Sequence, residues 1–521
     1  MAEPYYITTA ISYPNGRPHI GHAYEAIAAD VIARHRKAEG FDVRLQTGTD
    51  EHGLKMAQKA RELDTTPAEL AAEMSGYFRA MCDGLNIDYD VFIRTTEPRH
   101  HAATQELWRR MEAAGDLYLD RYEGWYSVRD EAYYDESELV TDEAGHKLSP
   151  QGTPVEWTVE ESWFFRLSKY QEQLLELYRT SDFIRPESRR NEVMRFVEGG
   201  LRDLSVSRTS FDWGVPVPGS DGHVMYVWVD ALTNYLTGLG FPDEGGDTAK
   251  WWPANLHLIG KDIVRFHTVY WPAFLMSAQL ALPKQVFGHG FLLNRGQKES
   301  KSLGNVTDPL ALADQFGVDT LRYFLLREVA FGQDGSYSPE AIVTRVNAEL
   351  ANSFGNLAQR TLSMIFKNMG GDLKVGQELA EADVALNDAV ALGVAGLRRA
   401  FLDLDFSDGL EAWMRAVFAC NQYVDEQAPW TLRKTDPARM EAVLMTLLRC
   451  VRSLAIAVRP VVPSAIDNLL DQMGVDPAER DYAALSNTKW LESLAASGFT
   501  LSQPTGVFPR LELPAAEVVT A

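Results

Sequence analysis

Apolar residues follow two different spacings along the chain, and the change falls near residue 308. Before it, short β-branched and aromatic runs alternate with stretches of helical periodicity, which is typical of a parallel sheet with crossover helices. After it, amphipathic helical stretches follow one another with polar connections, which predicts a bundle with short loops. We expect helices at 314–327, 339–369, 378–404, 407–427, 436–458 and 464–473, and no further strands.

The first strand and helix predict an anion site. Residues 4–13 form a strand-like run, the segment 14–18 must turn because it holds two prolines and a glycine, and helical spacing then runs from His19 to a stop at Gly40. This order aims backbone N–H groups and the helix dipole at an anion. His19-Ile20-Gly21-His22 stands at the turn, where glycine lets a flat or charged ligand approach. The alternative is that one histidine caps the helix and the other packs in the core.

Later strands also end in residues that are placed to bind a ligand. The run at 41–45 leads to Thr49-Asp50-Glu51-His52-Gly53. A carboxylate at the carboxyl end of a parallel strand can receive an amine or a ribose hydroxyl, and the alternative for Asp50 is a helix N-cap. The strand at 255–259 ends in Gly260-Lys261-Asp262, and the strand at 285–293 leads to Lys298-Glu299-Ser300-Lys301-Ser302.

The last of these strings favours a phosphate clamp. It holds two of the 14 lysines of a chain that has 36 arginines. Lysine presents a compact point charge that suits a mobile clamp on phosphate. A solvated basic turn is the alternative, and the position after a strand, together with the histidine motif, favours the clamp.

Two intermediate stretches have patterns of their own. Residues 115–222 break the strand–helix rhythm with clustered aromatics and short polar turns, which indicates an inserted small α+β module. Residues 226–236 predict a helix that carries Trp228, Ala231 and Tyr235 on related faces. The alternative for that helix is a core-facing aromatic stripe.

Composition excludes several classes of protein. The chain of 521 residues is too long for one core and should hold about two or three domains. No apolar run reaches membrane-spanning length, and the first strand begins too early to leave room for a signal peptide. Cys82, Cys420 and Cys450 are scattered, which excludes a disulfide framework and a zinc ribbon and suits a reducing cytoplasm.

The net charge of −23 argues, on its face, against a polyanionic partner. The distribution of charge matters more than the total, however, and local basic strips are present at 185–195, at 345–360 and at Arg433-Lys434. Composition therefore neither supports nor excludes binding to a nucleic acid.

The motifs identify a resemblance. His19-Ile20-Gly21-His22 and Lys298-Glu299-Ser300-Lys301-Ser302 resemble the two signatures of class I aminoacyl-tRNA synthetases. Five further strings, at 10–13, 49–53, 226–231, 260–267 and 423–430, resemble the methionyl-tRNA synthetases, and the similarity runs from about residue 5 to about 460.

The resemblance implies an α/β protein with a Rossmann-like parallel-sheet catalytic domain, an inserted connective α+β module and an α-helical anticodon-binding bundle. On the sequence, the expected divisions are 1–114 and 223–295 for the two catalytic halves, 115–222 for the insertion, 296–345 for the lysine-loop and stem-contact region, 346–497 for the bundle and 498–521 for a tail that folds back or frays.

The resemblance also implies a reaction and a set of residues. Methionine and ATP would give methionyl-adenylate and pyrophosphate, and the methionyl group would pass to the 3′-terminal ribose of tRNA(Met) and initiator tRNA. The expected catalytic residues are His19, His22, Lys298 and Lys301. Expected ATP contacts are His19, Gly21, His22, Gly260, Lys261, Asp262, Lys298, Ser300, Lys301 and Ser302, and expected methionine contacts are Ile11, Tyr13, Asp50, Trp228, Ala231, Tyr235, Ile263 and His267.

Anticodon reading is expected in the bundle, at Asn356, Arg360, Pro429 and Trp430. Specific recognition of RNA needs bases that stack on aromatic or arginine planes and form hydrogen bonds along their edges. The alternative for Trp430 is a loop tryptophan buried against the bundle, and its polar flanks favour an exposed ring.

Three departures from the family pattern qualify the resemblance. The loops of the insertion carry no cysteine pairs, and His146 alone cannot hold zinc, so we expect no structural zinc and only the Mg²⁺ that accompanies ATP. Leu232 and Glu299 replace residues common in the family. The insertion is also too short for a large editing domain.

Two other functions share some of these features. A nucleotidyltransferase would use the same histidine motif but would not carry a helical domain of this size, and a non-catalytic tRNA-binding relative should have lost His19, His22 or Lys301. The sequence favours a cytoplasmic monomer that does not enter membranes.

Overall fold

The computed structural model describes residues 2–129, 132–142, 144–299 and 306–513. The chain divides into two compact units. One comprises residues 4–29 and 43–289, and the other comprises residues 1–3, 30–42 and 290–521.

The first unit is built on a six-stranded sheet with the order β3-β2-β1-β13-β14-β9. The pairs β2–β3, β1–β13, β13–β14 and β14–β9 all run parallel. Strand order reverses direction between β1 and β13, and the carboxyl ends of two such strands form the usual ligand crevice of an open α/β sheet. The strands are β1 (Pro4–Thr9), β2 (Asp42–Thr49), β3 (Val91–Arg94), β9 (Ile184–Arg185), β13 (Leu256–Gly260) and β14 (Val286–His289).

Helices cover this sheet, as its apolar composition requires. All five residues of β13 and all four of β14 are buried, and one large core cluster includes the fully buried Trp108 of α4 and Trp271 of α10. Strand β3 lies between α3 and α4, and its short run was not recognised as a strand from the sequence. The helices are α1 (Ile20–Ala38), α2 (Leu54–Glu62), α3 (Pro67–Gly84), α4 (Pro98–Ala113), α7 (Val227–Leu232), α8 (Asn234–Thr237), α9 (Gly246–Trp251) and α10 (Trp271–Ser277), with a 3₁₀ turn η3 (Lys261–Ile263) and a π turn η4 (Phe266–Tyr270) before α10.

Residues 117–208 add a second, antiparallel sheet with the order β10-β8-β4-β5. Strands β4 and β8 pair over ten positions, from Leu117 opposite Phe165 to Tyr126 opposite Glu156. The buried Arg208 guanidinium lies 4.5 Å from the ring centroids of both Tyr133 and Tyr226. The elements are β4 (Leu117–Ser127), β5 (Ala132–Tyr134), η1 (Glu136–Glu138), β6 (Val140–Thr141), β7 (Lys147–Leu148), β8 (Glu156–Phe165), η2 (Leu167–Tyr170), α5 (Gln171–Thr180), α6 (Glu187–Glu198), β10 (Leu204–Ser205), β11 (Ser207–Arg208) and β12 (Val224–Met225).

Two strand expectations near residue 290 are wrong. The single strand expected at 285–293 is two, β14 and β15 (Leu292–Asn294), and β15 pairs in parallel with β16 (Gly335–Tyr337), where no strand was expected. Gly290 explains the break, because a Cβ there would lie 2.1 Å from the backbone oxygen of Gln333. Only a glycine lets the two segments approach this closely.

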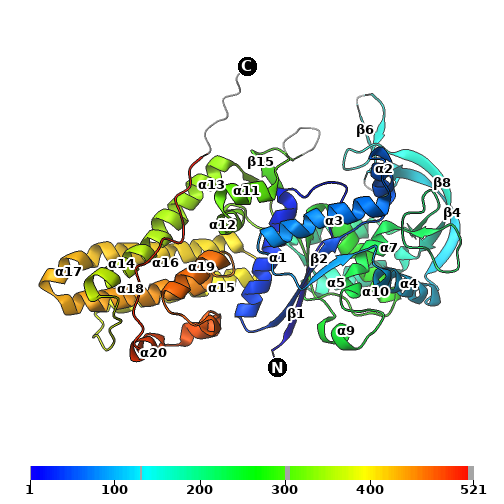
Figure 1. Ribbon diagram of the computed structural model, residues 1–521. Helices are drawn as coiled ribbons and strands as arrows, with labels where there is room; N and C mark the ends of the chain where they lie inside the picture. The colour runs from blue at the N-terminus through cyan, green and yellow to red at the C-terminus, as the bar shows by residue number, and fades with distance from the viewer. Residues whose placement is uncertain (1, 130–131, 143, 300–305, 514–521) are drawn as a thin grey trace, which may run out of the picture. The chain divides into compact units, whose positions relative to one another are not determined.

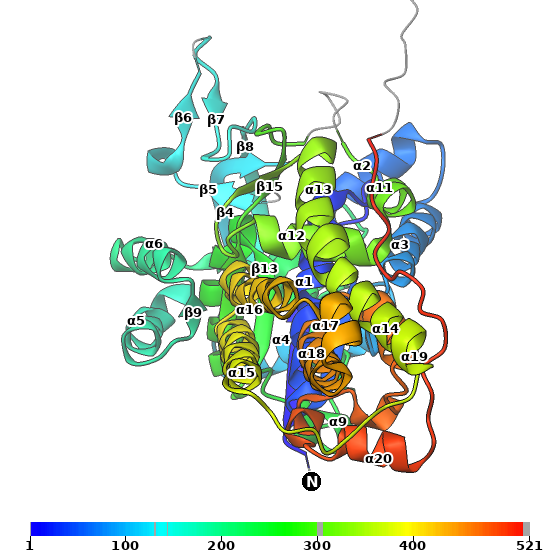
Figure 2. The same ribbon diagram turned by 90° about the vertical axis from the view of Figure 1, so that its left-hand side faces the viewer.

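The second unit is predominantly helical, and Figure 1 shows its long helices α15, α16 and α18 running lengthwise together. Figure 2 shows α15 and α16 side by side. Glycine allows their close approach, since a Cβ on Gly393 would lie 2.5 Å from Cβ of Ala416. The helices are α11 (Pro309–Phe316), α12 (Val318–Glu328), α13 (Pro339–Val346), a π segment η6 (Asn347–Gly355), α14 (Asn356–Met369), α15 (Glu381–Leu402), α16 (Phe406–Gln427), α17 (Pro429–Thr435), α18 (Pro437–Val458), α19 (Pro463–Gln472), η7 (Pro477–Glu479), η8 (Tyr482–Ser486) and α20 (Trp490–Ala496).

Residues 499–513 fold back along this unit. Thr500 bridges Asp372, and Leu511 exchanges two hydrogen bonds with the side chain of Asn347, at 2.8 and 2.9 Å. The expected α/β fold followed by a helical bundle is therefore confirmed. Within the described ranges, no helix has the length and apolar character needed to cross a membrane.

Candidate functional site

The two histidines of the first motif are held by backbone hydrogen bonds at the start of α1. The amide of Gly21 donates to Nδ1 of His19, and the amide of His19 donates to Nδ1 of His22, each over 3.1 Å. An amide is always a donor, so both Nδ1 atoms are acceptors and each neutral ring carries its proton on Nε2. The ring centroids are 3.9 Å apart. The turn therefore sets two Nε2–H donors beside each other.

Gly21 is necessary for this arrangement. A Cβ at that position would lie 2.9 Å from Cε1 and 3.1 Å from Nδ1 of His19. These distances are shorter than ordinary carbon contacts, so any side chain would displace the His19 ring. Gly21 was expected to let a ligand approach the backbone, and it also leaves room for the His19 ring.

Sequence reasoning missed a buried pair next to this turn, Glu25 on α1 and His289 at the end of β14. Nε2 of His289 lies 2.9 Å from Oε2 of Glu25. Burial raises the pKa of Glu25, and the hydrogen bond from His289 opposes that rise. The position of Glu25, three residues after His22 on the same helix, was the available signal.

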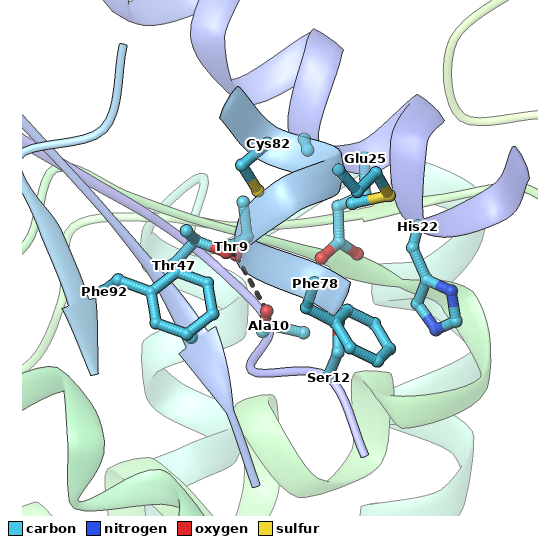
Figure 3. Close-up of a pocket in the computed structure, with 12 residues that line it drawn as sticks. Thr9, Ala10, Ser12, His22, Glu25, Thr47, Phe78, Cys82 and Phe92 are labelled. Carbon is cyan, nitrogen blue, oxygen red and sulfur yellow. Dashed lines mark hydrogen bonds between the residues drawn. The ribbon is translucent and has the colours of Figure 1, made fainter. Parts of the chain in front are cut away.

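Figure 3 shows Glu25 and His22 on adjoining sides of a small cavity at the end of β1. Its volume is about 10 Å³, which is room for one water molecule. Thr9, Ala10 and Ser12 line it from the strand side.

The carboxyl end of β13 supplies the neighbouring group. Gly260 pairs with His289 across the sheet, so Lys261 and Asp262 of η3 follow immediately beyond the strand end. A Cβ on Gly260 would lie 2.7 Å from Oδ1 of Asp262. Glycine here allows the Asp262 carboxylate to fold back over the strand end. The structure thus brings two of the three expected ATP-contact groups, the histidine motif and residues 260–262, to the adjacent strands β1 and β13.

Four of the expected methionine contacts form one aromatic group. The Trp228 ring of α7 stacks on Phe266 at 3.9 Å and meets His267 edge-on at 5.9 Å. Tyr235 of α8 donates its hydroxyl hydrogen to Nε2 of His267 over 2.7 Å. Ile263 joins the group because its carbonyl accepts from Nδ1 of His267 over 3.0 Å.

His267 is neutral in this setting. A carbonyl only accepts, so Nδ1 carries the proton and Nε2 accepts from Tyr235. Burial lowers the pKa of His267 to about 4, although the hydrogen bond to Ile263 partly opposes it. The π turn at Phe266–Tyr270 carries this ring, and π turns often occur at functional sites. The result is an uncharged, polarisable wall of the kind that a thioether requires.

Asp50 is fixed from both sides by its neighbours. Glu51 accepts two hydrogen bonds from Arg94, at 2.7 and 3.1 Å, and His52 contacts Asp230. Asp50 itself is buried, and its charge contributes, after burial, Glu25 and Tyr6, to the raised pKa of Tyr235. The contact of His52 with Asp230 ties the loop of Asp50 to α7, and Asp50 is not a helix N-cap, because Gly53 precedes α2.

A buried carboxylate joins these elements. Asp230 of α7 is fully buried, and its two oxygens lie 2.7 Å from Nδ1 of His52 and 2.7 Å from Nε2 of His100. Burial alone would raise the pKa of Asp230, but the two histidines outweigh it and hold that pKa below its ordinary value. Asp230 lies between Trp228 and the buried Ala231, so it ties the aromatic group to the loop that carries Asp50.

Tyr13 and Ile11 occupy a different position. The Tyr13 hydroxyl accepts from the amide of Met56 over 3.0 Å, and Lys55 lies 5.0 Å from its ring centroid. Tyr13 therefore satisfies an amide in the first turn of α2. Ile11 is half-buried after β1.

The lysine loop is described only in part. Nζ of Lys298 lies 4.5 Å from the ring centroid of Phe291. Glu299 accepts from the Tyr337 hydroxyl at 2.5 Å and from the amide of Thr307 at 3.2 Å, so this unusual residue attaches the loop to β16. Ser300, Lys301 and Ser302 lie outside the described residues.

The expected anticodon contacts lie together on the bundle. Trp430 is 48% exposed, and Cζ of Arg360 lies 5.6 Å from its ring centroid. Asn356 is exposed one helical turn before Arg360 on α14. The prediction of an exposed Trp430 ring is confirmed, but the ring lies on a short helix, α17, rather than on a loop. The buried Pro429 starts that helix.

No group of three or more histidine, cysteine, aspartate or glutamate residues suited to a metal ion occurs among the residues that the structure describes. In the insertion, His146 contacts Asp142 at 3.1 Å. Other residues of the insertion form aromatic pairs, such as Trp125 with Trp157.

Comparisons with known proteins agree in every part of the chain. A family model for class I tRNA synthetases (M) matches residues 5–362, and a model for the anticodon binding domain of methionyl tRNA ligase matches residues 374–517. The chain is 54% identical to a methionine–tRNA ligase of Mesorhizobium japonicum over 99% of both sequences, and 55% identical to one of Brucella suis over 98% of both.

Solved structures give the same result. The Mycobacterium tuberculosis methionyl-tRNA synthetase in complex with methionyl-adenylate is similar with a TM-score of 0.93, at 53% identity, over 98% of this chain and 100% of that one. Its apo form is similar with a TM-score of 0.87, at 50% identity, over 99% of both chains.

Proposed function

This chain belongs to the methionyl-tRNA ligases of the class I tRNA synthetases, and we infer from that premise that it activates methionine with ATP and transfers it to tRNA. One observation supports placing the reaction at this site. Two Nε2–H donors at the start of α1 and an uncharged aromatic pocket lie at the ends of neighbouring strands. A carboxylate oxygen of methionine attacks the α-phosphorus of ATP, and pyrophosphate leaves.

Positioning and charge stabilisation supply the rate of such a phosphoryl displacement. His19 and His22 donate from Nε2 to the phosphate oxygens as negative charge moves toward the leaving pyrophosphate. Lys298 and Lys301 contribute positive charge from the loop, assisted by Lys261. Ser300, Ser302, Gly260 and Asp262 complete the ATP site, with Asp262 on the ribose side.

Methionine is held at both ends. The Asp50 carboxylate pairs with the ammonium group, since its loop is anchored by Glu51 and His52. The thioether lies against Trp228 and the neutral His267 ring. Ile11, Tyr13, Ala231, Tyr235 and Ile263 form the rest of the pocket.

The remaining partners follow from this chemistry. Mg²⁺ accompanies the ATP phosphates rather than occupying a protein cage. Elongator and initiator tRNA(Met) are the acceptors, with Asn356, Arg360, Pro429 and Trp430 meeting the anticodon. The enzyme acts as a monomer in the cytoplasm, a compartment that keeps its three buried cysteines reduced.

Pyrophosphate exchange with each of the twenty amino acids in turn tests the assignment. We expect exchange that depends on methionine and on ATP, and charging of tRNA(Met) in a second assay. Exchange without any amino acid would point to a nucleotidyltransferase, and tRNA binding without exchange would point to a non-catalytic relative.

Elemental analysis should find no stoichiometric zinc in the purified enzyme. The loops of the insertion lack thiolates, and His146 already contacts Asp142, so four zinc ligands are not assembled there. Zinc-selective chelation should leave methionine-dependent exchange unchanged when Mg²⁺ is kept in excess. One zinc per chain would contradict this prediction.

Replacing Trp430 with alanine should weaken recognition of tRNA by about 1–3 kcal/mol, the usual value of one base stacked on an aromatic ring. Methionine-dependent exchange should not change, since the half-exposed ring contributes little to the core. Charging kinetics and exchange are measured on the same preparation. Phe418→Ala, which removes another half-exposed aromatic ring from α16, is the matched control. An equal loss of both activities in Trp430→Ala would mean that the residue is structural.

A further inference from the structure

A second cavity, lined by none of the residues proposed above, lies in the helical unit. It is bounded by α15, α18 and the segment that carries η8 and α20, and its volume is about 520 Å³. Cavities of roughly 300–1,000 Å³ are of the size that holds small organic ligands. Trp430 and Arg360 do not line it.

The wall of this cavity is strongly basic. Arg398, Arg449 and Arg452 line it, and among the described residues that do so none is aspartate or glutamate. Such a wall is unexpected in a chain with a net charge of −23. Arg398 is already paired with Glu39 at 2.6 Å. The guanidinium groups of Arg449 and Arg452 are therefore the two in this wall for which no ion pair with a carboxylate is found among the described residues.

Arg452 is the more deeply buried of the two. Its side chain is only 3% exposed, one of its terminal nitrogens donates to the carbonyl of Ala484 over 3.0 Å, and its Nε is buried without a hydrogen-bond partner. Guanidinium groups stay protonated in proteins. A buried charged group whose N–H has no hydrogen-bond acceptor destabilises the fold, and a ligand that supplies the acceptor removes that cost.

Two carboxylates lie within electrostatic reach but do not fill this role. Burial lowers the pKa of Arg449, and the charge of Glu492 opposes that change only in part. Burial also lowers the pKa of Arg452, and Glu479 opposes that change only in part. Glu479 accepts a hydrogen bond from Asn487 over 2.9 Å. Neither carboxylate lines the cavity.

The remainder of the wall mixes polar residues, such as Asn387 and Asn487, with an apolar and aromatic part. The Trp490 ring centroid lies 4.9 Å from Cζ of Arg452, and Val394 of α15 contributes an aliphatic surface. A ligand that satisfied both arginines would therefore bring a non-polar body against this surface.

We propose that this cavity binds a small phosphate monoester, with the phosphate at Arg449 and Arg452 and an aromatic or aliphatic group against Trp490 and Val394. Arg449 and Arg452 are three residues apart on α18, so their side chains are neighbours on one helix face. A phosphate monoester carries a charge of about −1.5 to −2 with three acceptor oxygens, which matches two guanidinium groups better than the single charge of a carboxylate.

Calorimetric titration of the full-length protein with phenyl phosphate tests the proposal. Inorganic phosphate, benzoate and phenol are titrated in parallel. We expect saturable binding of phenyl phosphate that is tighter than that of each comparator. ATP at a concentration that saturates the adenylation site should not displace it.

Two variants and one control assign the site. Arg449→Gln should weaken phenyl phosphate about 10-fold or more, as loss of a charged hydrogen-bond partner does, and Val394→Trp should block binding by filling the cavity. Arg399→Gln removes the same charge from α15 at a side chain that is 82% exposed, and it should leave affinity unchanged. All three should retain methionine-dependent exchange.

Several outcomes would overturn the proposal. These are absence of saturable binding, binding that survives Arg449→Gln but is displaced by ATP, and equal weakening by Arg399→Gln. Benzoate that binds as tightly as phenyl phosphate would show that the site does not select phosphate.

Discussion

Replacing Gly21 with alanine should lower the rate of methionyl-adenylate formation by roughly two to three orders of magnitude, the usual cost of one lost transition-state donor. The added Cβ would lie 2.9 Å from Cε1 of His19, so the ring must move and its Nε2–H loses its aim. Methionine affinity should barely change, because the aromatic pocket lies on other elements. Single-turnover adenylate formation and methionine titration measure the two quantities.

A matched substitution separates this effect from a loss of stability. Gly76→Ala also replaces a helical glycine, on α3, where a Cβ would meet nothing within 4 Å. Alanine in a helix interior is favoured over glycine by roughly 0.5–1 kcal/mol, so the Gly76→Ala variant should fold at least as well as the parent and keep its rate of adenylate formation. A Gly21→Ala enzyme with an unchanged chemical step would show that His19 does not act on the phosphates.

Replacing Asp230 with asparagine should reduce the free energy of unfolding by about 3–6 kcal/mol, because two buried hydrogen bonds to its charged carboxylate contribute roughly 1.5–3 kcal/mol each. The change leaves His52 and His100 buried without their shared carboxylate. The methionine concentration at half-saturation should also rise, because Asp230 ties Trp228 to the loop of Asp50. Urea unfolding followed by tryptophan fluorescence and methionine titration provide the two readouts.

The dependence of this loss on pH has a definite sign. The folded protein lowers the pKa of Asp230, so the ionised form stabilises the fold at any pH above the ordinary aspartate value of about 4. The difference in stability between parent and variant should be present at neutral pH and shrink as the pH falls below that value. Asp247→Asn, which breaks the exposed pair with Arg44, is the control and should cost at most about 1 kcal/mol. A stability difference that grows on acidification would contradict the assignment.

The parts of the fold that could be predicted are those with local signals. Turn chemistry and helix periodicity are short-range properties, so a few neighbouring residues are enough to recognise them. This holds for the turn at 14–18, the helix start at His19 and the glycines at 21 and 260. The amphipathic helices of the bundle were recognised for the same reason. Even Pro429, which starts α17, carried a local signal that the loop interpretation overlooked.

The parts that could not be predicted depend on pairs far apart in the chain. Glu25 meets His289, and Asp230 meets His52, across separations of 264 and 178 residues. No spacing rule links such positions, and each residue viewed alone is an ordinary helix, strand or loop residue. Strands β3 and β16 were missed similarly, because their short sequences become strands only by pairing with β2 and β15.

The π turn at Phe266–Tyr270 makes the proposed methionine pocket depend on the number of residues in that turn, as well as on their types. A π turn contains one residue more than the α-helical turn it replaces and is less favourable. Deleting that extra residue would restore regular helical geometry ahead of α10 and rotate His267 by about 100°, the angle of one residue in an α-helix. Its bond with Tyr235 would then be lost although every side chain was still present. Selection for a more regular helix and selection for methionine therefore oppose each other at this turn.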